Sequence, residues 1–159
     1  MSTDSKAVTA SDTEATGLDE VDENAAITLC SSDGKSVELS RKHASLSGVV
    51  RVALESDPMT TTIPFNMESA LLEKVARYLE HHKGVAPENP KQPLESTDMK
   101  VVCKNEWDAD FMQEFDDLES LTALILAANY LAIEPLLQLA CAKVAVLVRL
   151  GRLPIKPFF

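Results

Sequence analysis

A long, nearly uncharged run constrains this chain more than any other segment. It extends from Leu124 to Leu137 and reads L-I-L-A-A-N-Y-L-A-I-E-P-L-L, with no charged side chain between Glu119 and Glu134. Such a run is too apolar to face water over its whole circumference, yet it is shorter than the roughly 20 apolar residues that cross a bilayer. We therefore expect it to be buried in protein, either in the core of this chain or against a partner.

The length and charge of the chain limit what it can do. A chain of 159 residues predicts one domain with loose ends, because domains commonly have about 100 to 200 residues. The formal net charge of -10 opposes binding to a phosphate backbone, which requires clustered Lys and Arg. We therefore expect a protein partner, with no nucleic acid and no membrane as partners.

The cysteines and the N-terminus bear on location. Cys30, Cys103 and Cys141 are odd in number and widely spaced, which fits neither a disulfide framework nor a C-x-x-C metal site. A reducing, intracellular environment is the simplest interpretation. The N-terminus contains acids and lacks the basic and apolar regions of a signal peptide. These features predict a cytoplasmic or nuclear protein.

The first part of the chain changes character near residue 25. Residues 1–24 are rich in Ser, Thr, Asp and Glu, so they predict a disordered acidic head that serves as a solvating tail or as a phosphorylation target. From Ala26, apolar residues alternate on both sides of S-S-D-G-K. This pattern predicts an antiparallel hairpin in which Asp33 and Gly34 supply the positive φ angles of the turn.

Two helices and a short strand are expected next. Ser47 is a candidate N-cap for a helix that Asp57-Pro58 ends, and T-T-T-I-P-F then suits a small strand. Asn66 is a candidate cap for a helix from about Met67 to Lys83, whose apolar residues recur every three or four positions. Together these patterns predict a small sheet beside amphipathic helices.

The rest of the chain reads as a loop followed by helices. Residues 84–104 contain three prolines at intervals of three, which suits a surface loop or a polyproline ligand. The spacing of Trp107, Phe111 and Phe115 predicts one apolar face of a short helix in an acidic segment. Two helices, about 118–131 and 135–150, should follow with almost no loop between them, and residues 151–159 form a short tail. The order predicts an α+β domain.

The sequence contains no recognisable frame for catalysis or metal binding. It lacks a glycine-rich phosphate loop, H-E-x-x-H and G-x-S-x-G, so we expect no catalytic residue, no cofactor and no metal. His81 and His82 are adjacent, and on a helix they point about 100° apart, so both cannot reach one metal. We interpret them as exposed residues at a helix end. We therefore expect this protein to act by binding, and we do not expect it to be an enzyme.

Four blocks taken together resemble the Skp adaptor family of SCF ubiquitin ligases, of which Elongin C is a close relative. They are S-S-D-G-K (31–35), I-P-F-N-M-E-S-A-L-L-E-K-V-A-R-Y-L-E-H-H-K (63–83), N-E-W-D-A-D-F (105–111) and L-I-L-A-A-N-Y-L (124–131). The resemblance covers residues 25–150 and implies a BTB/POZ-like fold with a small, mainly antiparallel sheet flanked by helices. It also implies a non-catalytic adaptor that bridges a cullin scaffold to F-box substrate receptors in ubiquitin-dependent protein degradation.

The resemblance also implies where the partners bind. Cullin contact in the family falls on the A-N-Y-L block, which matches Asn129 and Tyr130. F-box contact runs along the next helix, whose matching face is Leu136, Leu137, Cys141 and Val144. Where the family continues with G-K-T-P-E-E-I-R and further helices, this chain has G-R-L-P-I-K-P-F-F. We therefore expect a truncated C-terminal helical extension, which leaves the receptor side less complete.

Two other binding functions stay open at this point. An Elongin C-like adaptor would bind a short helix from a different receptor class on the same terminal helices, and the short C-terminus favours it. A self-associating BTB module would instead pair its apolar helices with a second copy, as a homodimer. Identification of the bound partners separates these functions.

Overall fold

The computed structural model describes residues 22–90, 94–103 and 105–152. The predicted head, apart from residues 22–24, lies outside these residues, as do Pro93 of the predicted loop and residues 153–159 of the tail. Within the described part, strands and helices follow one another in the predicted order, with two additional short helices. The α+β class is confirmed.

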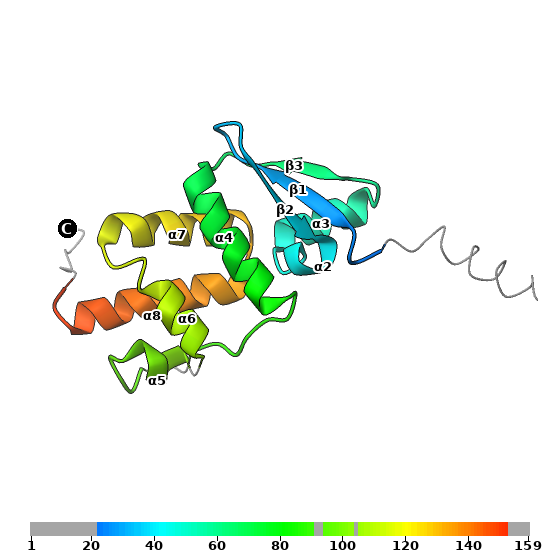
Figure 1. Ribbon diagram of the computed structural model, residues 1–159. Helices are drawn as coiled ribbons and strands as arrows, with labels where there is room; N and C mark the ends of the chain where they lie inside the picture. The colour runs from blue at the N-terminus through cyan, green and yellow to red at the C-terminus, as the bar shows by residue number, and fades with distance from the viewer. Residues whose placement is uncertain (1–21, 91–93, 104, 153–159) are drawn as a thin grey trace, which may run out of the picture.

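A three-stranded sheet forms one end of the fold, in the order β2-β1-β3 (Figure 1). The central strand β1 (Ala26–Cys30) pairs antiparallel with β2 (Ser36–Ser40) and parallel with the short β3 (Thr62–Pro64). Ile27 lies opposite Leu39, and both side chains are buried. The predicted hairpin is therefore confirmed, and β3 adds a short parallel edge to it.

The turn between β1 and β2 needs only one left-handed residue. Gly34 has a φ of +90°, a conformation that glycine adopts at little steric cost. Asp33 does not have a positive φ, so the prediction for that residue was wrong. The reason is the length of the connection: Ser31 donates from its N–H to the Lys35 carbonyl at 2.8 Å, so the loop is longer than a two-residue turn.

Two helices follow the hairpin. The short helix α2 (Arg41–Ala44) packs on β1 and β2. The helix α3 (Gly48–Ser56) begins after Ser47, whose extended backbone and side-chain oxygen, 3.3 Å from the Val50 N–H, make it the N-cap. The predicted cap at Ser47 is confirmed.

The long helix α4 (Ser69–His82) carries the predicted apolar stripe but begins later than expected. Glu68 occupies the N-cap position and makes no side-chain cap hydrogen bond, so the prediction that Asn66 caps this helix was wrong. The carboxylate of Asp33 instead accepts from the Ser69 Oγ at 2.8 Å. A side chain from the hairpin turn therefore holds the start of α4 where a local cap was expected.

Two short helices lie beyond α4. Helix α5 (Met99–Cys103) falls inside the segment that was predicted as a loop. Helix α6 (Glu106–Met112) is capped by Asn105, whose Oδ1 accepts from the backbone N–H groups of Trp107 and Asp108 at 3.0 and 3.3 Å. This cap begins the helix that carries Trp107 and Phe111 of the predicted aromatic face, whereas Phe115 lies beyond the end of the helix.

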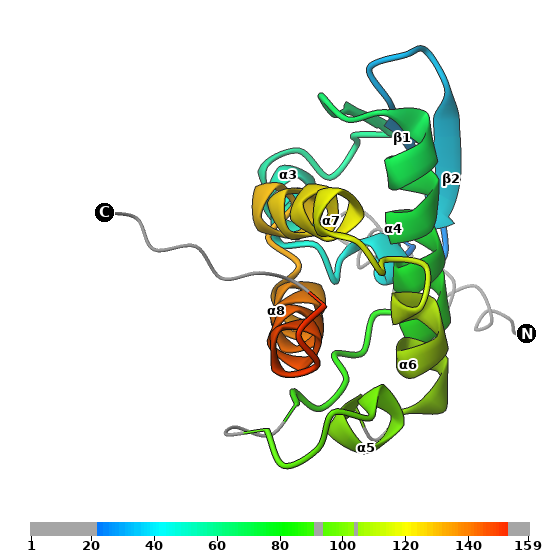
Figure 2. The same ribbon diagram turned by 90° about the vertical axis from the view of Figure 1, so that its left-hand side faces the viewer.

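The last two helices match their predicted ranges closely. Helix α7 (Leu118–Tyr130) begins after Asp117, which accepts from the Ser120 N–H at 2.7 Å. Helix α8 (Glu134–Arg149) has Pro135 in its first turn, where the missing N–H costs nothing. Figures 1 and 2 show α7 and α8 beside each other on one side of α4, and the two helices are in contact.

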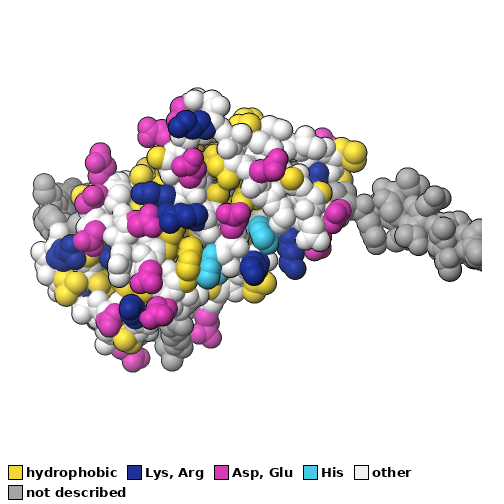
Figure 3. Space-filling model, in the orientation of Figure 1, with side chains coloured by type: hydrophobic (Ala, Val, Ile, Leu, Met, Phe, Trp, Pro, Cys, Tyr) yellow, Lys and Arg dark blue, Asp and Glu magenta, His cyan; other side chains and the backbone are white. Residues whose placement is uncertain are grey.

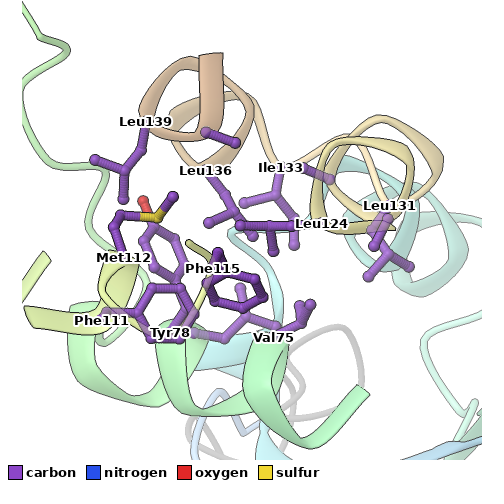
Figure 4. Packing of buried hydrophobic residues seen from close by; sticks show 14 of the residues in the cluster. Val75, Tyr78, Phe111, Met112, Phe115, Leu124, Leu131, Ile133, Leu136 and Leu139 are labelled. Atoms are coloured by element: carbon purple, nitrogen blue, oxygen red, sulfur yellow. The ribbon is translucent and has the colours of Figure 1, made fainter. Parts of the chain in front are cut away.

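The larger part of the core lies where α4, α6, α7 and α8 meet. Figure 4 shows rings from α4 and from the α6 region facing the aliphatic side chains of α7 and α8. The fully buried members shown there include Val75, Tyr78, Met112, Leu124, Ile133 and Leu136. Aliphatic residues dominate this core, in which α7 and α8 pack closely against α4 and α6.

Candidate protein-docking site

Tyr130 is the single aromatic residue of the apolar run. It ends α7 with 48% of its surface exposed, and the adjacent Asn129 is exposed as well. Its ring meets that of Phe65 edge-on at a centroid distance of 6.0 Å, and its hydroxyl oxygen accepts from the Asn66 N–H at 3.4 Å. The β3–α4 connection therefore holds one side of Tyr130, while the other side faces solvent.

A groove of about 520 Å³ lies beside this residue, between the start of α4 and the outer face of α7. Leu126, one helical turn before Tyr130, is 63% exposed at its edge. The groove is lined by Asn66, Met67, Glu68, Leu71, Ala123, Leu126, Ala127, Asn129 and Tyr130. An aromatic ring and an exposed leucine beside a concave apolar surface are typical of a protein-docking site.

The two faces of α7 explain how so apolar a helix is accommodated. Leu121, Leu124 and Ala128 recur at three- and four-residue spacing and are completely buried. Leu126 and Tyr130 lie four residues apart on the opposite face, where both are exposed. The apolar run is therefore partly core and partly open surface. Burial in the core of this chain is confirmed for its buried face, and burial of the open face against a partner stays a prediction.

Helix α8 divides the predicted receptor-binding residues between its two faces. Leu137 and Val144 are half-buried and Cys141 is exposed, and their spacing of four and three places them on one face. Leu136 is completely buried among the core residues, so the expectation that it shares this open face was wrong. It adjoins Leu137 in sequence, and neighbouring residues on a helix point about 100° apart.

His82 does not lie at an exposed helix end, as the sequence suggested. Its Nε2 is 2.7 Å from the Oδ1 of Asp108, and the two side chains are only 6% and 5% exposed. His81 is exposed and stacks on Trp107 with a centroid distance of 4.0 Å. The two histidines therefore join α4 to α6 by a buried polar contact and a surface stack.

Buried ionisable groups surround this contact. Burial is the main cause of a raised pKa at the Tyr78 hydroxyl, and the negative charge of the nearby Asp108 carboxylate raises this pKa further. The hydroxyl is buried without a hydrogen-bond partner. Burial likewise raises the pKa of the Cys103 thiol to about 12. Both groups are therefore neutral at physiological pH, and a neutral buried thiol is a poor nucleophile.

Two observations on the described part of the chain concern metal ligands and membrane spans. In residues 22–90, 94–103 and 105–152, His, Cys, Asp and Glu side chains do not gather in threes as metal ligands would. None of the helices described is both long and apolar enough to cross a bilayer. On the face shown in Figure 3, acidic and basic side chains lie interspersed with hydrophobic atoms between them.

Comparison with known proteins identifies the family. A family model described as "Skp1 family, tetramerisation domain" matches residues 25–84. The chain is 39% identical over 130 residues to the "E3 ubiquitin ligase complex SCF subunit sconC" of Arthroderma benhamiae, an alignment that covers 80% of this chain and 77% of that protein.

Proteins of two other organisms are also similar to this chain. The identity is 34% over 124 residues to the "S-phase kinase-associated protein 1 homolog" of Tetrahymena thermophila, covering 77% of this chain and 74% of that protein. The identity to "SKP1-like protein 11" of Arabidopsis thaliana is 39% over 132 residues, covering 80% of this chain and 77% of that protein. With most of its length aligned to these relatives and the predicted BTB/POZ-like fold confirmed, this chain belongs to the Skp1 family.

Proposed function

We propose that this protein is a non-catalytic adaptor subunit of an SCF-type E3 ubiquitin ligase, which bridges a cullin scaffold to F-box substrate receptors. Membership of the Skp1 family supports this function, as do relatives that are named SCF subunits. An adaptor acts by holding a substrate receptor and the rest of the ligase together, which raises the effective concentration of substrate for ubiquitin transfer. Its own residues then need to bind partners and perform no chemistry.

The groove beside Tyr130 is the surface proposed for the cullin, and it is the observation on which the proposal mainly depends. Asn129 and Tyr130 are exposed on α7 and border a concave apolar surface. Tyrosine suits such a position, since its ring gives a large apolar contact and its hydroxyl a polar one. Because Phe65 and Asn66 already hold the ring, little side-chain entropy would be lost on binding.

The face formed by Leu137, Cys141 and Val144 is the surface proposed for the F-box protein. These side chains remain partly or fully open although the opposite face of α8 is in the core. A row of apolar residues at spacings of four and three suits a partner helix packed alongside. Leu136 is left out of this surface, because its side chain is completely buried.

The two alternatives have less support. Relatives named SCF subunits favour an F-box partner over the receptor class that an Elongin C-like adaptor would bind. Self-association through the apolar helices would use the same exposed leucine and tyrosine as the cullin, so a homodimer and a cullin complex would exclude each other at the groove. This exclusion makes the two functions separable by experiment.

Affinity purification of the full chain, followed by mass spectrometry of the bound proteins, tests the proposed function. A cullin recovered together with F-box proteins is the expected result. Recovery of an Elongin-type receptor without F-box proteins would favour the first alternative. A tight dimer by light scattering, with no cullin bound, would contradict the adaptor role and favour the second.

A further inference from the structure

The connection between the two proposed docking surfaces is held by a third element, the N-terminus of α3. Residues 131–133 join α7, which borders the groove, to α8, which carries the receptor face. The Ser47 Oγ donates to the Leu131 carbonyl at 2.5 Å, and the Gly48 N–H donates to the Ala132 carbonyl at 2.9 Å. The Val49 N–H also donates to the Leu131 carbonyl, at 3.3 Å.

These bonds use groups that a helix start offers to any nearby carbonyl. The first N–H groups of a helix have no partner within it, and the helix dipole places partial positive charge at that end. Ser47 is completely buried, so its hydroxyl bonds inside the protein and not with water. It accepts from the Val50 N–H in addition, and so caps α3 and binds the connector at once.

The connector and α3 also approach each other too closely for any side chain at Gly48. A Cβ at that position would lie 2.9 Å from the Cβ of Ala132 and 3.2 Å from its carbonyl oxygen. Ala132 itself has a φ of +54°, which costs an alanine free energy that a glycine would not pay. The backbone of the connector is therefore held in a sparsely populated conformation by its contacts with α3.

We propose that Ser47 and Gly48 are positioning residues that set the angle between α7 and α8. They would thereby fix the orientation of the groove beside Tyr130 relative to the face of Leu137, Cys141 and Val144. The consequence for ligase assembly rests on the proposed function, whereas the consequence for the interhelical angle does not. Because the connector has few residues, a small change of its backbone turns the whole of α8.

Distance measurements between α7 and α8 test this proposal in the full chain without any partner. Spin labels on the native Cys141 and on Thr122→Cys, both exposed positions, report the distance by double electron–electron resonance, with Cys30→Ser removing a competing thiol. Gly48→Ala is expected to shift or broaden the distance distribution, since the added methyl group displaces Ala132. An unchanged distribution in a folded Gly48→Ala protein would overturn the proposal.

A second substitution makes the test specific for the contact. Ala132→Gly removes the Cβ that the new methyl group would meet, so adding it to Gly48→Ala is expected to restore the distribution toward that of the parent. Failure of this rescue would also contradict the proposal. If the Gly48→Ala protein does not fold, Ser47→Ala gives the same comparison, because it removes the bond to Leu131 without adding volume.

Loss of a helix cap elsewhere controls for general destabilisation. Asn105→Ala removes the cap of α6, which has no bond to the connector. It is expected to lower the melting temperature while leaving the distance between α7 and α8 unchanged. If it broadens the distribution as much as Ser47→Ala does, the positioning role is wrong. Since no cullin or F-box protein is present, this outcome is independent of whether the proposed adaptor function holds.

Discussion

The Nε2 of His82 lies 2.7 Å from the Oδ1 of Asp108, and both side chains are almost completely removed from solvent. This contact joins the C-terminal end of α4 to α6. The rings of Tyr78 and His82 are 4.5 Å apart, so the histidine is enclosed by aromatic side chains as well. A buried polar pair of this kind is costly to break, because removing one member leaves the other without a partner.

Asp108→Ala is therefore expected to lower the free energy of unfolding by about 3 kcal/mol, the size typical of breaking a buried polar pair. Urea unfolding at neutral pH, followed by circular dichroism, measures this change. The double variant His82→Leu with Asp108→Leu should cost less than the sum of the two single changes, since it leaves no unpaired polar group. Strict additivity of the two changes would show that the contact does not contribute to stability.

Asp33, in the hairpin turn, should make the stability of the fold depend on pH in the acid range. Hydrogen bonds from Ser31 and Ser69 lower the pKa of Asp33 from 3.8 to about 2. A carboxylate with a lowered folded-state pKa stabilises the fold above its unfolded pKa, and that contribution is lost as the pH falls through the folded value. Asp33 is exposed, so solvent screening makes its contribution small.

Asp33→Asn is expected to lower the urea midpoint at pH 6, and its difference from the parent should shrink as the pH falls from 3.8 toward 2. Paired urea titrations across this range measure the effect. Glu55→Gln, a change of an exposed acid on α3, serves as a control that should not show the same trend. A difference that stays constant down to pH 2 would contradict the role assigned to Asp33.

The cysteines should differ in reactivity. Because burial raises the pKa of Cys103 to about 12, its thiolate is scarce at pH 8. Cys141 is exposed on α8. Iodoacetamide is therefore expected to alkylate Cys141 well before Cys103 in the folded protein, as followed by peptide mass spectrometry. In urea the two rates should converge, and equal rates in the folded protein would show that the α5 region opens readily.

Local patterns predicted most of the elements, and tertiary contacts account for the exceptions. The cap at Ser47 is predicted correctly because the interaction is local: the Ser47 Oγ accepts from the Val50 N–H, three residues away. Asn66 was assigned the same role wrongly, since Asp33 reaches Ser69 from the hairpin turn. His82 is predicted to lie at an exposed helix end. In the structure it is buried instead, because it pairs with Asp108 of α6. Sequence periodicity contains no signal for contacts of this range.

The candidate site likewise combines residues that the sequence predicts with residues that only tertiary contacts bring into place. The residues of α7 were identified from the apolar run and from the resemblance, and the structure places Asn129 and Tyr130 at an open surface. The opposite wall of the groove comes from Asn66, Met67 and Glu68, which lie far earlier in the chain. Nothing in the spacing of these residues indicates that they face α7. Their place follows only from the packing of α4 beside α7.

The central claim is that the groove beside Tyr130 binds a cullin, and titration calorimetry with a cullin N-terminal domain tests it most directly. Asn129→Lys with Tyr130→Lys should abolish binding while the circular dichroism spectrum stays that of the parent, because both side chains are exposed. Cys141→Lys, on the receptor face, should leave cullin binding intact. Undiminished cullin binding by the folded Asn129→Lys, Tyr130→Lys protein would contradict the account.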